Sequence, residues 1–125
     1  MIHKMALLVV AGAVGTLARY GTAGIVQKIY GASFPWGTMV VNLTGCFCAG
    51  FLWVLFENRL AVSGETRTII LVGFMGAFTT FSAFILETGE LIRSAEWASA
   101  FANLAVQNVI GLVALFVGMA LAKFL

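Results

Sequence analysis

Residues 73–84 read Gly-Phe-Met-Gly-Ala-Phe-Thr-Thr-Phe-Ser-Ala-Phe, and this stretch decides what kind of helix its segment can form. Thr79, Thr80 and Ser82 place three hydroxyl groups within four positions, so they cannot share one helical face. Two glycines stand just before them and weaken the helix further. We therefore expect a local break at about residues 76–80.

The sequence around this stretch is apolar enough to have lipid as its solvent. Of the 125 residues, 62% are hydrophobic and 10% are charged, too few charges for the exterior of a soluble domain. A membrane-crossing helix needs about 20 mostly apolar residues, so four crossings use nearly all of the chain. We expect one all-α transmembrane domain, residues 1–125, with helices at about 5–25, 37–56, 67–91 and 97–123, the third of them broken.

Composition argues against several other classes of protein. The seven Lys and Arg are spread along the chain, which disfavours nucleic acid as a partner. Asp is absent, which removes the commonest ligand for hard metals and the paired carboxylates of many hydrolases, so we do not expect an enzyme. Cys46 and Cys48 have no further Cys to complete a thiolate metal site and are interpreted as small apolar residues.

Polar and helix-breaking residues mark the connections between the segments. Pro35, the only proline, lies in a break between Tyr30 and Trp36. Ser63 and Ser94 are placed to cap the segments that follow them. The first 13 residues could also be interpreted as a signal peptide, but a retained helix is favoured because everything downstream is equally apolar.

The positive charges divide almost evenly between the two sides of the predicted bundle. Lys and Arg bias sets membrane orientation, so a balanced chain can insert both ways round and pair antiparallel with itself. Four helices alone pack solidly, so we expect a dimer as the smallest unit with a water-filled path. One side carries Lys4, Arg59, Arg67 and Lys123, and the other Lys28, Arg93 and, if it snorkels, Arg19.

Asparagine and glutamine side chains inside the second and fourth segments are candidates for an anion path. Asn42 shares a helical face with Thr38 and offers two uncharged donors. Asn103 and Gln107 lie one turn apart on the fourth segment and could line a polar track. Because membrane helices also use such amides as interhelical glue, that structural interpretation stays open for both segments.

Two further pairs of side chains are candidates near the break. Phe81 and Phe84 lie three residues apart on one face, and the positive edge of an aromatic ring can stabilise an anion. The alternative is that both face lipid or the protein core. Arg19 could pair with Glu87 across the interface, or either could snorkel to water.

Together these motifs resemble the Fluc or CrcB family of fluoride channels over the full chain. The resemblance is carried by Gly12-Ala13-Val14-Gly15 with Arg19, by Gly37-Thr38-Met39-Val40-Val41-Asn42 with Gly45, and by Gly73-Phe74 with Gly76 and Thr79-Thr80-Phe81-Ser82-Ala83-Phe84. The third motif is the most specific of the three.

The resemblance implies a dual-topology, antiparallel homodimer in the inner or plasma membrane, with two pores lined by both subunits. In such a family Asn42 would face the pore, Phe81 and Phe84 would line the fluoride path, and Thr80 and Ser82 would add hydroxyl groups. Backbone carbonyls of Gly76 and Thr79 would hold a structural Na⁺ on the dimer axis. The activity implied is passive export of fluoride that entered the cell as HF.

The fourth segment departs from the family pattern, in which a Tyr and a Ser lie one turn apart on the pore side. Asn103 and Gln107 stand at the matching positions. Both can still form hydrogen bonds, so a polar track is expected there with different ion coordination.

Two rival functions remain at this point. A small multidrug exporter also has four helices, but it couples transport to protons through a carboxylate in its first segment, and here Glu87 alone could serve. A purely structural membrane protein would use its polar residues only to hold helices together.

Overall fold

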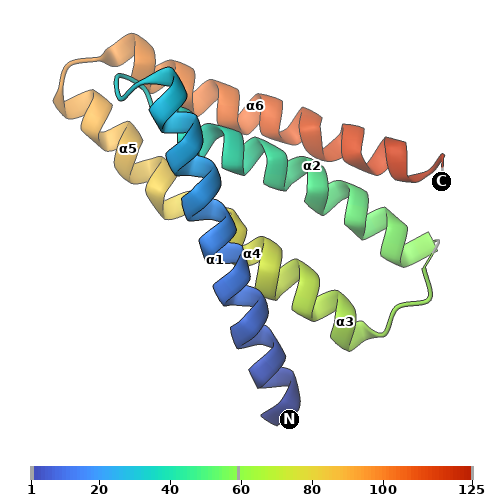
Figure 1. Cartoon of the computed structure of the whole chain (residues 1–125). Coiled ribbons are helices and arrows are strands. Elements are labelled where there is room, and N and C mark those ends of the chain that lie inside the picture. The colour runs from blue at the N-terminus through green and yellow to red at the C-terminus, as the bar shows by residue number, and fades with distance from the viewer. Residues whose placement is uncertain (1, 59, 125) are drawn as a thin grey trace.

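Four helical spans make up the architecture. The computed structural model of the chain describes residues 2–58 and 60–124, and all regular structure within those ranges is helical (Figure 1). By length and composition four stretches could cross a membrane, which confirms the predicted all-α class. They are Ile2–Tyr30, Trp36–Asn58, Gly64–Arg93 and Trp97–Ala122. Arg59, part of the predicted middle loop, lies outside the described residues.

The first span is the single helix α1, Ile2–Tyr30, which continues past the predicted end near residue 25. It ends where Gly31 adopts a φ of +85°, a conformation that favours glycine, and Pro35 follows before the next helix. Gln27 closes this connection, because its Nε2 donates to the carbonyls of Gly31 at 2.5 Å and Phe34 at 2.8 Å. The Gln27 Oε1 accepts from the Gly37 N–H at 3.0 Å, so one side chain secures the whole turn.

Helices α2, Trp36–Asn58, and α6, Trp97–Ala122, lie side by side along much of their length (Figure 1). A Cβ atom added at Gly50 would run into the carbonyl oxygen of Leu115, and one at Gly118 into that of Phe47. The two backbones therefore approach more closely than any other residue type would allow.

Helix α1 crosses the third span in front of α4 (Figure 1). Gly15 makes this crossing close, because an added Cβ would collide with the carbonyl oxygen of Phe74 and lie 3.1 Å from Ala77 Cβ. The third span consists of α3, Gly64–Thr68, the π-helical segment η1, Ile69–Met75, α4, Gly76–Phe78, and α5, Phe81–Arg93.

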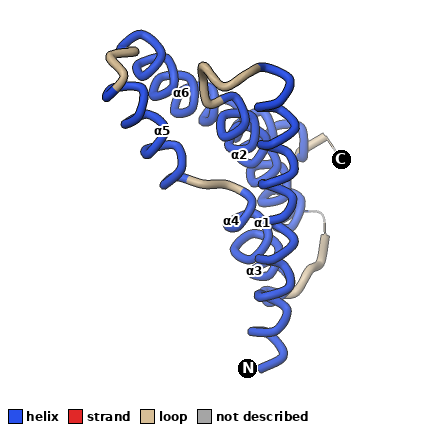
Figure 2. Tube along the Cα trace, turned by 60° about the vertical axis from the view of Figure 1, so that its left-hand side comes forward, coloured by secondary structure: helices blue, strands red, loops and turns tan. Residues whose placement is uncertain are grey.

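Two residues interrupt the third span between α4 and α5 (Figure 2). Thr79 has φ −84° and ψ 161°, and Thr80 has φ −151° and ψ 119°, both extended. The sequence placed a break at about residues 76–80, whereas Gly76 begins a short helix here. Thr80 then caps α5, because its Oγ1 accepts from the Ala83 N–H at 3.2 Å.

Of the two predicted helix caps at the other connections, one is confirmed and one is wrong. Ser63 caps α3 as expected, accepting from the Thr66 N–H at 3.1 Å. The prediction for Ser94 is wrong, since Ser94 ends α5 and Glu96 takes the position before α6. Ala95 between them has φ +60°, and this left-handed residue separates Ser94 from the start of α6 by a sharp turn.

Candidate functional site

Asn42 on α2 reaches the interruption and binds both backbone groups of Thr80, its N–H and its carbonyl. The Asn42 Nδ2 donates to the Thr80 carbonyl at 3.0 Å, and the Thr80 N–H donates to Asn42 Oδ1 at 2.8 Å. Backbone groups that leave a helix inside a membrane need such partners, because lipid offers none. From the sequence, Asn42 was predicted to bind an anion, and that role stays a prediction. In the structure its amide stabilises the interruption.

The amide of Asn42 is joined to α6 as well. Its Nδ2 donates to Gln107 Oε1 at 2.7 Å, and Gln107 Nε2 donates to Asn103 Oδ1 at 2.8 Å. The spacing of Asn103 and Gln107 therefore places them in contact, as a helical i, i+4 pair allows. Asn103 has no exposed surface and donates to Thr88 Oγ1 at 2.9 Å, so any contact of Asn103 with an ion stays a prediction.

Phe81 and Phe84 lie against each other just after the interruption. Their ring centroids are 5.8 Å apart, and the ring planes are inclined by 57°. Phe84 is buried with 4% of its surface exposed, whereas Phe81 is 74% exposed. Both rings line a cavity of about 400 Å³, together with Asn42, Gly45, Cys46, Ala49, Leu71, Met75, Gly76, Thr79, Thr80, Gln107, Asn108 and Leu115.

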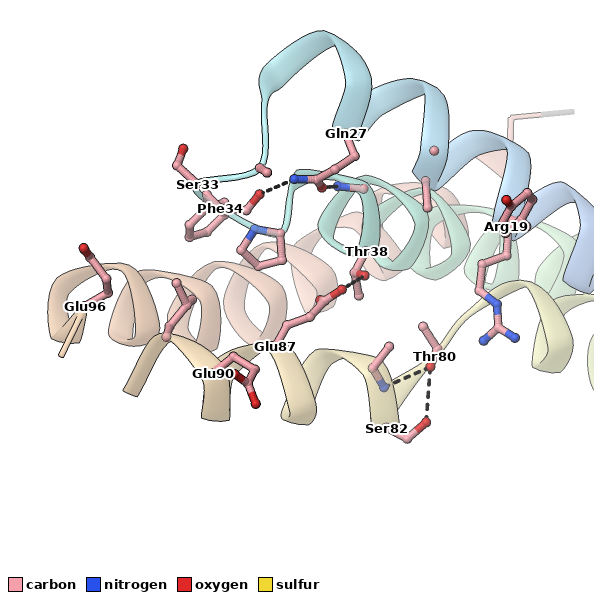
Figure 3. A pocket seen from close by; sticks show the side chains of 18 of the residues that line it. Arg19, Gln27, Ser33, Phe34, Thr38, Thr80, Ser82, Glu87, Glu90 and Glu96 are labelled. Carbon is pink, nitrogen blue, oxygen red and sulfur yellow. Dashed lines mark hydrogen bonds between the residues drawn. The ribbon is translucent and has the colours of Figure 1, made fainter. Parts of the chain in front are cut away.

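Thr80 also lines a second, larger cavity of about 940 Å³ (Figure 3). Ser82, Glu87 and Arg19 line it, and Figure 3 shows these side chains around the same space. Thr80 lines both cavities, so the interruption lies between them.

Arg19 and Glu87 share the larger cavity but bind different partners. Arg19 Nη1 donates to the Thr79 carbonyl at 3.4 Å. Glu87 Oε1 accepts from Thr38 Oγ1 at 2.6 Å (Figure 3). The other Glu87 oxygen is buried without a hydrogen-bond partner. Within residues 2–58 and 60–124 the ion pair found is between Arg93 and Glu90, 3.1 Å apart and exposed.

Two backbone carbonyls at the interruption lack the donors that a continuous helix would supply. The Thr80 N–H, which would donate to Gly76, donates to Asn42 instead, and the Ala83 N–H, which would donate to Thr79, donates to the Thr80 hydroxyl. Freed carbonyls of broken helices are the groups that coordinate Na⁺ in membrane transporters. The Gly76 and Thr79 carbonyl oxygens that the family resemblance implies for Na⁺ are groups of this kind, and the ion itself stays a prediction.

Sequence reasoning missed Thr88 and Gln27. Thr88 is 4% exposed and links α6 to α5 through Asn103, and its spacing of four from the candidate Phe84 could have indicated the shared helical face. Gln27 gave no signal, because its partners are backbone groups of a turn whose shape only the fold defines.

Comparison with known proteins assigns the family. The family model described as "CrcB-like protein, Camphor Resistance (CrcB)" matches residues 6–119. This chain belongs to the CrcB-like family. As a CrcB-like protein with four candidate spans, it is a multi-pass membrane protein.

Several relatives of this CrcB-like chain carry the name "Fluoride-specific ion channel FluC". The relative from Desulforapulum autotrophicum is 61% identical over 125 residues, which is the whole of both chains. Those from Nitrosococcus oceani and Solidesulfovibrio magneticus are 50% and 46% identical, again over the whole of both chains. Ion conduction is not an enzymatic activity, so these names confirm the prediction that the chain is not an enzyme.

Proposed function

We propose that this chain is a fluoride-selective ion channel that lets cytoplasmic fluoride leave passively, down its electrochemical gradient. The observation that carries the proposal is the position of Thr80, whose polar groups lie between two cavities at an interruption of a membrane span. The full-length relatives named as fluoride channels support the choice of ion.

Fluoride is small and strongly hydrated, so a selective pore has to replace its water with many donors. The hydroxyl groups of Thr80 and Ser82 would supply donors on one side of the interruption. Phe81 and Phe84 would supply positive ring edges on the other side, where Asn42 and Gln107 line the same cavity. Larger halides would be excluded by width.

The proposed working unit is an antiparallel homodimer with two pores at its interface. Irregular backbone is not tolerated against lipid at membrane depth, and Gly76 at the start of α4 is exposed in the single chain. A second copy would cover this region together with the exposed ring of Phe81. The balanced Lys and Arg content supports insertion both ways round, in the inner or plasma membrane.

A structural Na⁺ at the centre of the dimer is part of the proposal. The carbonyls of Gly76 and Thr79 would hold it, and a second copy would add its own pair. When bound, the ion would offset the partial negative charge of carbonyls that have left the helix. The guanidinium of Arg19 already donates to Thr79, and this carbonyl has a second lone pair for the ion.

Flux from liposomes tests the conduction proposal. Purified dimers would be reconstituted with fluoride inside, and efflux would be followed with a fluoride electrode after the membrane potential is clamped. We expect rapid efflux that excludes chloride and needs no proton gradient. Efflux that requires a proton gradient would favour an exporter working through Glu87, and verified dimers without flux would favour a structural protein.

The dimer and the ion need separate tests. An Ala95→Cys variant in a background without Cys46 and Cys48 would be labelled from outside in intact cells, and antiparallel insertion predicts that about half the chains react. Full labelling or none would overturn that arrangement. Replacing Na⁺ by a large organic cation during purification should lower the dimer fraction on gel filtration, and an unchanged fraction would argue against the ion.

A further inference from the structure

Four side chains and two backbone groups form one unbroken hydrogen-bond chain through the helix bundle, and every bond in it runs the same way. It starts at the Thr80 N–H, which donates to Asn42 Oδ1. Asn42 donates to Gln107, and Gln107 donates to Asn103. Asn103 then donates to Thr88 Oγ1.

The far end of the chain returns to the backbone of α5. Thr88 Oγ1 donates to the Phe84 carbonyl at 2.7 Å, one helical turn before it. The chain therefore joins the residue at the interruption to the residue whose ring lines the smaller cavity. Between its ends it passes through α2 and α6, so three spans share one network.

Three hydrogen bonds fix the orientation of the Asn42 amide. Both of its N–H groups are used, one for the Thr80 carbonyl and one for Gln107, and its oxygen accepts from Thr80. If the Asn42 amide were flipped, its own N–H groups would face the Thr80 N–H, which is also a donor. Bonds in a directed chain also polarise one another, so a change at one link weakens the links beside it.

Two members of the chain lie outside the lining of both cavities described above. Asn103 has no exposed surface and Thr88 is 4% exposed, and neither lines either cavity. Any effect of these two side chains on conduction must therefore act through the others. This separates them from Asn42 and Gln107, which line the smaller cavity.

We propose that Thr88 and Asn103 are positioning residues, which fix the Gln107 and Asn42 amides and so set the conducting shape of the interruption. The inference rests on the proposed fluoride conduction and adds residues that never touch the ion. In this protein the amides of α6 would act as an orienting chain, in which Gln107 keeps one N–H free to face the cavity.

A matched series at Thr88 tests the proposal. Thr88→Val keeps the shape and removes the hydroxyl, whereas Thr88→Ser keeps the hydroxyl. Thr68→Val is the control, because Thr68 Oγ1 also donates to the carbonyl four residues earlier, that of Gly64, at 2.8 Å, but its hydroxyl lies outside the chain. Fluoride efflux and the fluoride to chloride ratio would be measured per reconstituted dimer.

We expect Thr88→Val to lower fluoride efflux per dimer about tenfold and to reduce the fluoride to chloride ratio, the scale set by one lost buried hydrogen bond. Thr88→Ser and Thr68→Val should conduct like the unaltered protein. A purely structural role would lower the yield of dimers but leave the ratio unchanged, and this result would overturn the inference.

A second variant covers the case in which Thr88→Val does not assemble. Asn103→Leu breaks the same chain from α6, and unaltered efflux and selectivity per dimer would refute the positioning role. If the unaltered protein itself passes no fluoride, the proposed function fails instead. The two failures are therefore distinguishable.

Discussion

The backbone nitrogen of Thr80 and the side-chain Oδ1 of Asn42 lie 2.8 Å apart, and Asn42 Nδ2 returns a bond of 3.0 Å to the Thr80 carbonyl. This reciprocal pair gives the N–H and the carbonyl of Thr80 a partner where the third span leaves its helix at membrane depth. It also releases the Gly76 carbonyl, because the donor that a continuous helix would give it is now directed at Asn42. One side chain on α2 thus stabilises the interruption and exposes the oxygen proposed to bind Na⁺.

Replacing Asn42 by Asp keeps the shape of this side chain and removes both donors. We expect fluoride efflux from liposomes to fall about a hundredfold or more, because two hydrogen bonds worth roughly 1–3 kcal/mol each are lost and a carboxylate would repel an anion. Dimers of Asn42→Asp that conduct like the unaltered protein would exclude Asn42 from both proposed roles.

Phe81→Ile and Phe84→Ile should each reduce fluoride efflux by about tenfold, because an aliphatic side chain has no ring quadrupole to offer an anion. Phe101→Ile is the matched control, since Phe101 on α6 is 74% exposed, as Phe81 is, and lines neither cavity. The ring-edge path predicts loss in the first two variants and none in the third. Equal rates in all three would argue against it.

Gly118→Ala should destabilise the protein by about 1–3 kcal/mol, because the added methyl group would run into the Phe47 carbonyl and separate α2 from α6. Thermal unfolding in detergent would measure this as a lower midpoint. Gly64→Ala provides the control, because a Cβ there would meet no atom within 4 Å. A midpoint that falls equally in both variants would contradict the close approach of the two helices.

Gln27→Leu should lower stability by about 1–3 kcal/mol, since two carbonyls and one N–H of the turn between α1 and α2 would lose their partner. Gln27→Glu would keep the acceptor for Gly37 alone and should fall between Leu and the native residue. The readout is again the thermal midpoint in detergent. An unchanged midpoint for Gln27→Leu would mean that water replaces the hydrogen bonds that Gln27 makes to the turn.

Local sequence rules were sufficient for the spans but not for all of their ends. The long apolar segments and Pro35 placed the crossings, because burial in lipid depends on composition summed over about 20 residues. The end of α1 at Tyr30 and the cap of α6 were not predicted correctly. These ends depend on two turns, one with Gly31 and one with Ala95 at positive φ, and propensity alone does not define such turns.

For the candidate site, too, part could be predicted from the sequence and part could not. Asn42, Asn103 and Gln107 stood out because an amide inside an apolar segment is costly unless it is paired. The order in which these amides bind one another could not be predicted, since each amide has donors and an acceptor that suit many partners. Thr88 was overlooked because a hydroxyl can satisfy itself on its own helix and so carries little signal in the sequence.

The sequence by itself determined that this protein has four membrane spans and that the third is disturbed near Thr79 and Thr80, since hydropathy, glycine and hydroxyl residues act locally. The tertiary structure alone decided which groups the polar side chains bind. It directs Arg19 to the Thr79 carbonyl and Glu87 to Thr38, although the two charged side chains share a cavity. Partner choice depends on distances of about 3 Å between atoms from different helices, and only the packing of those helices sets them.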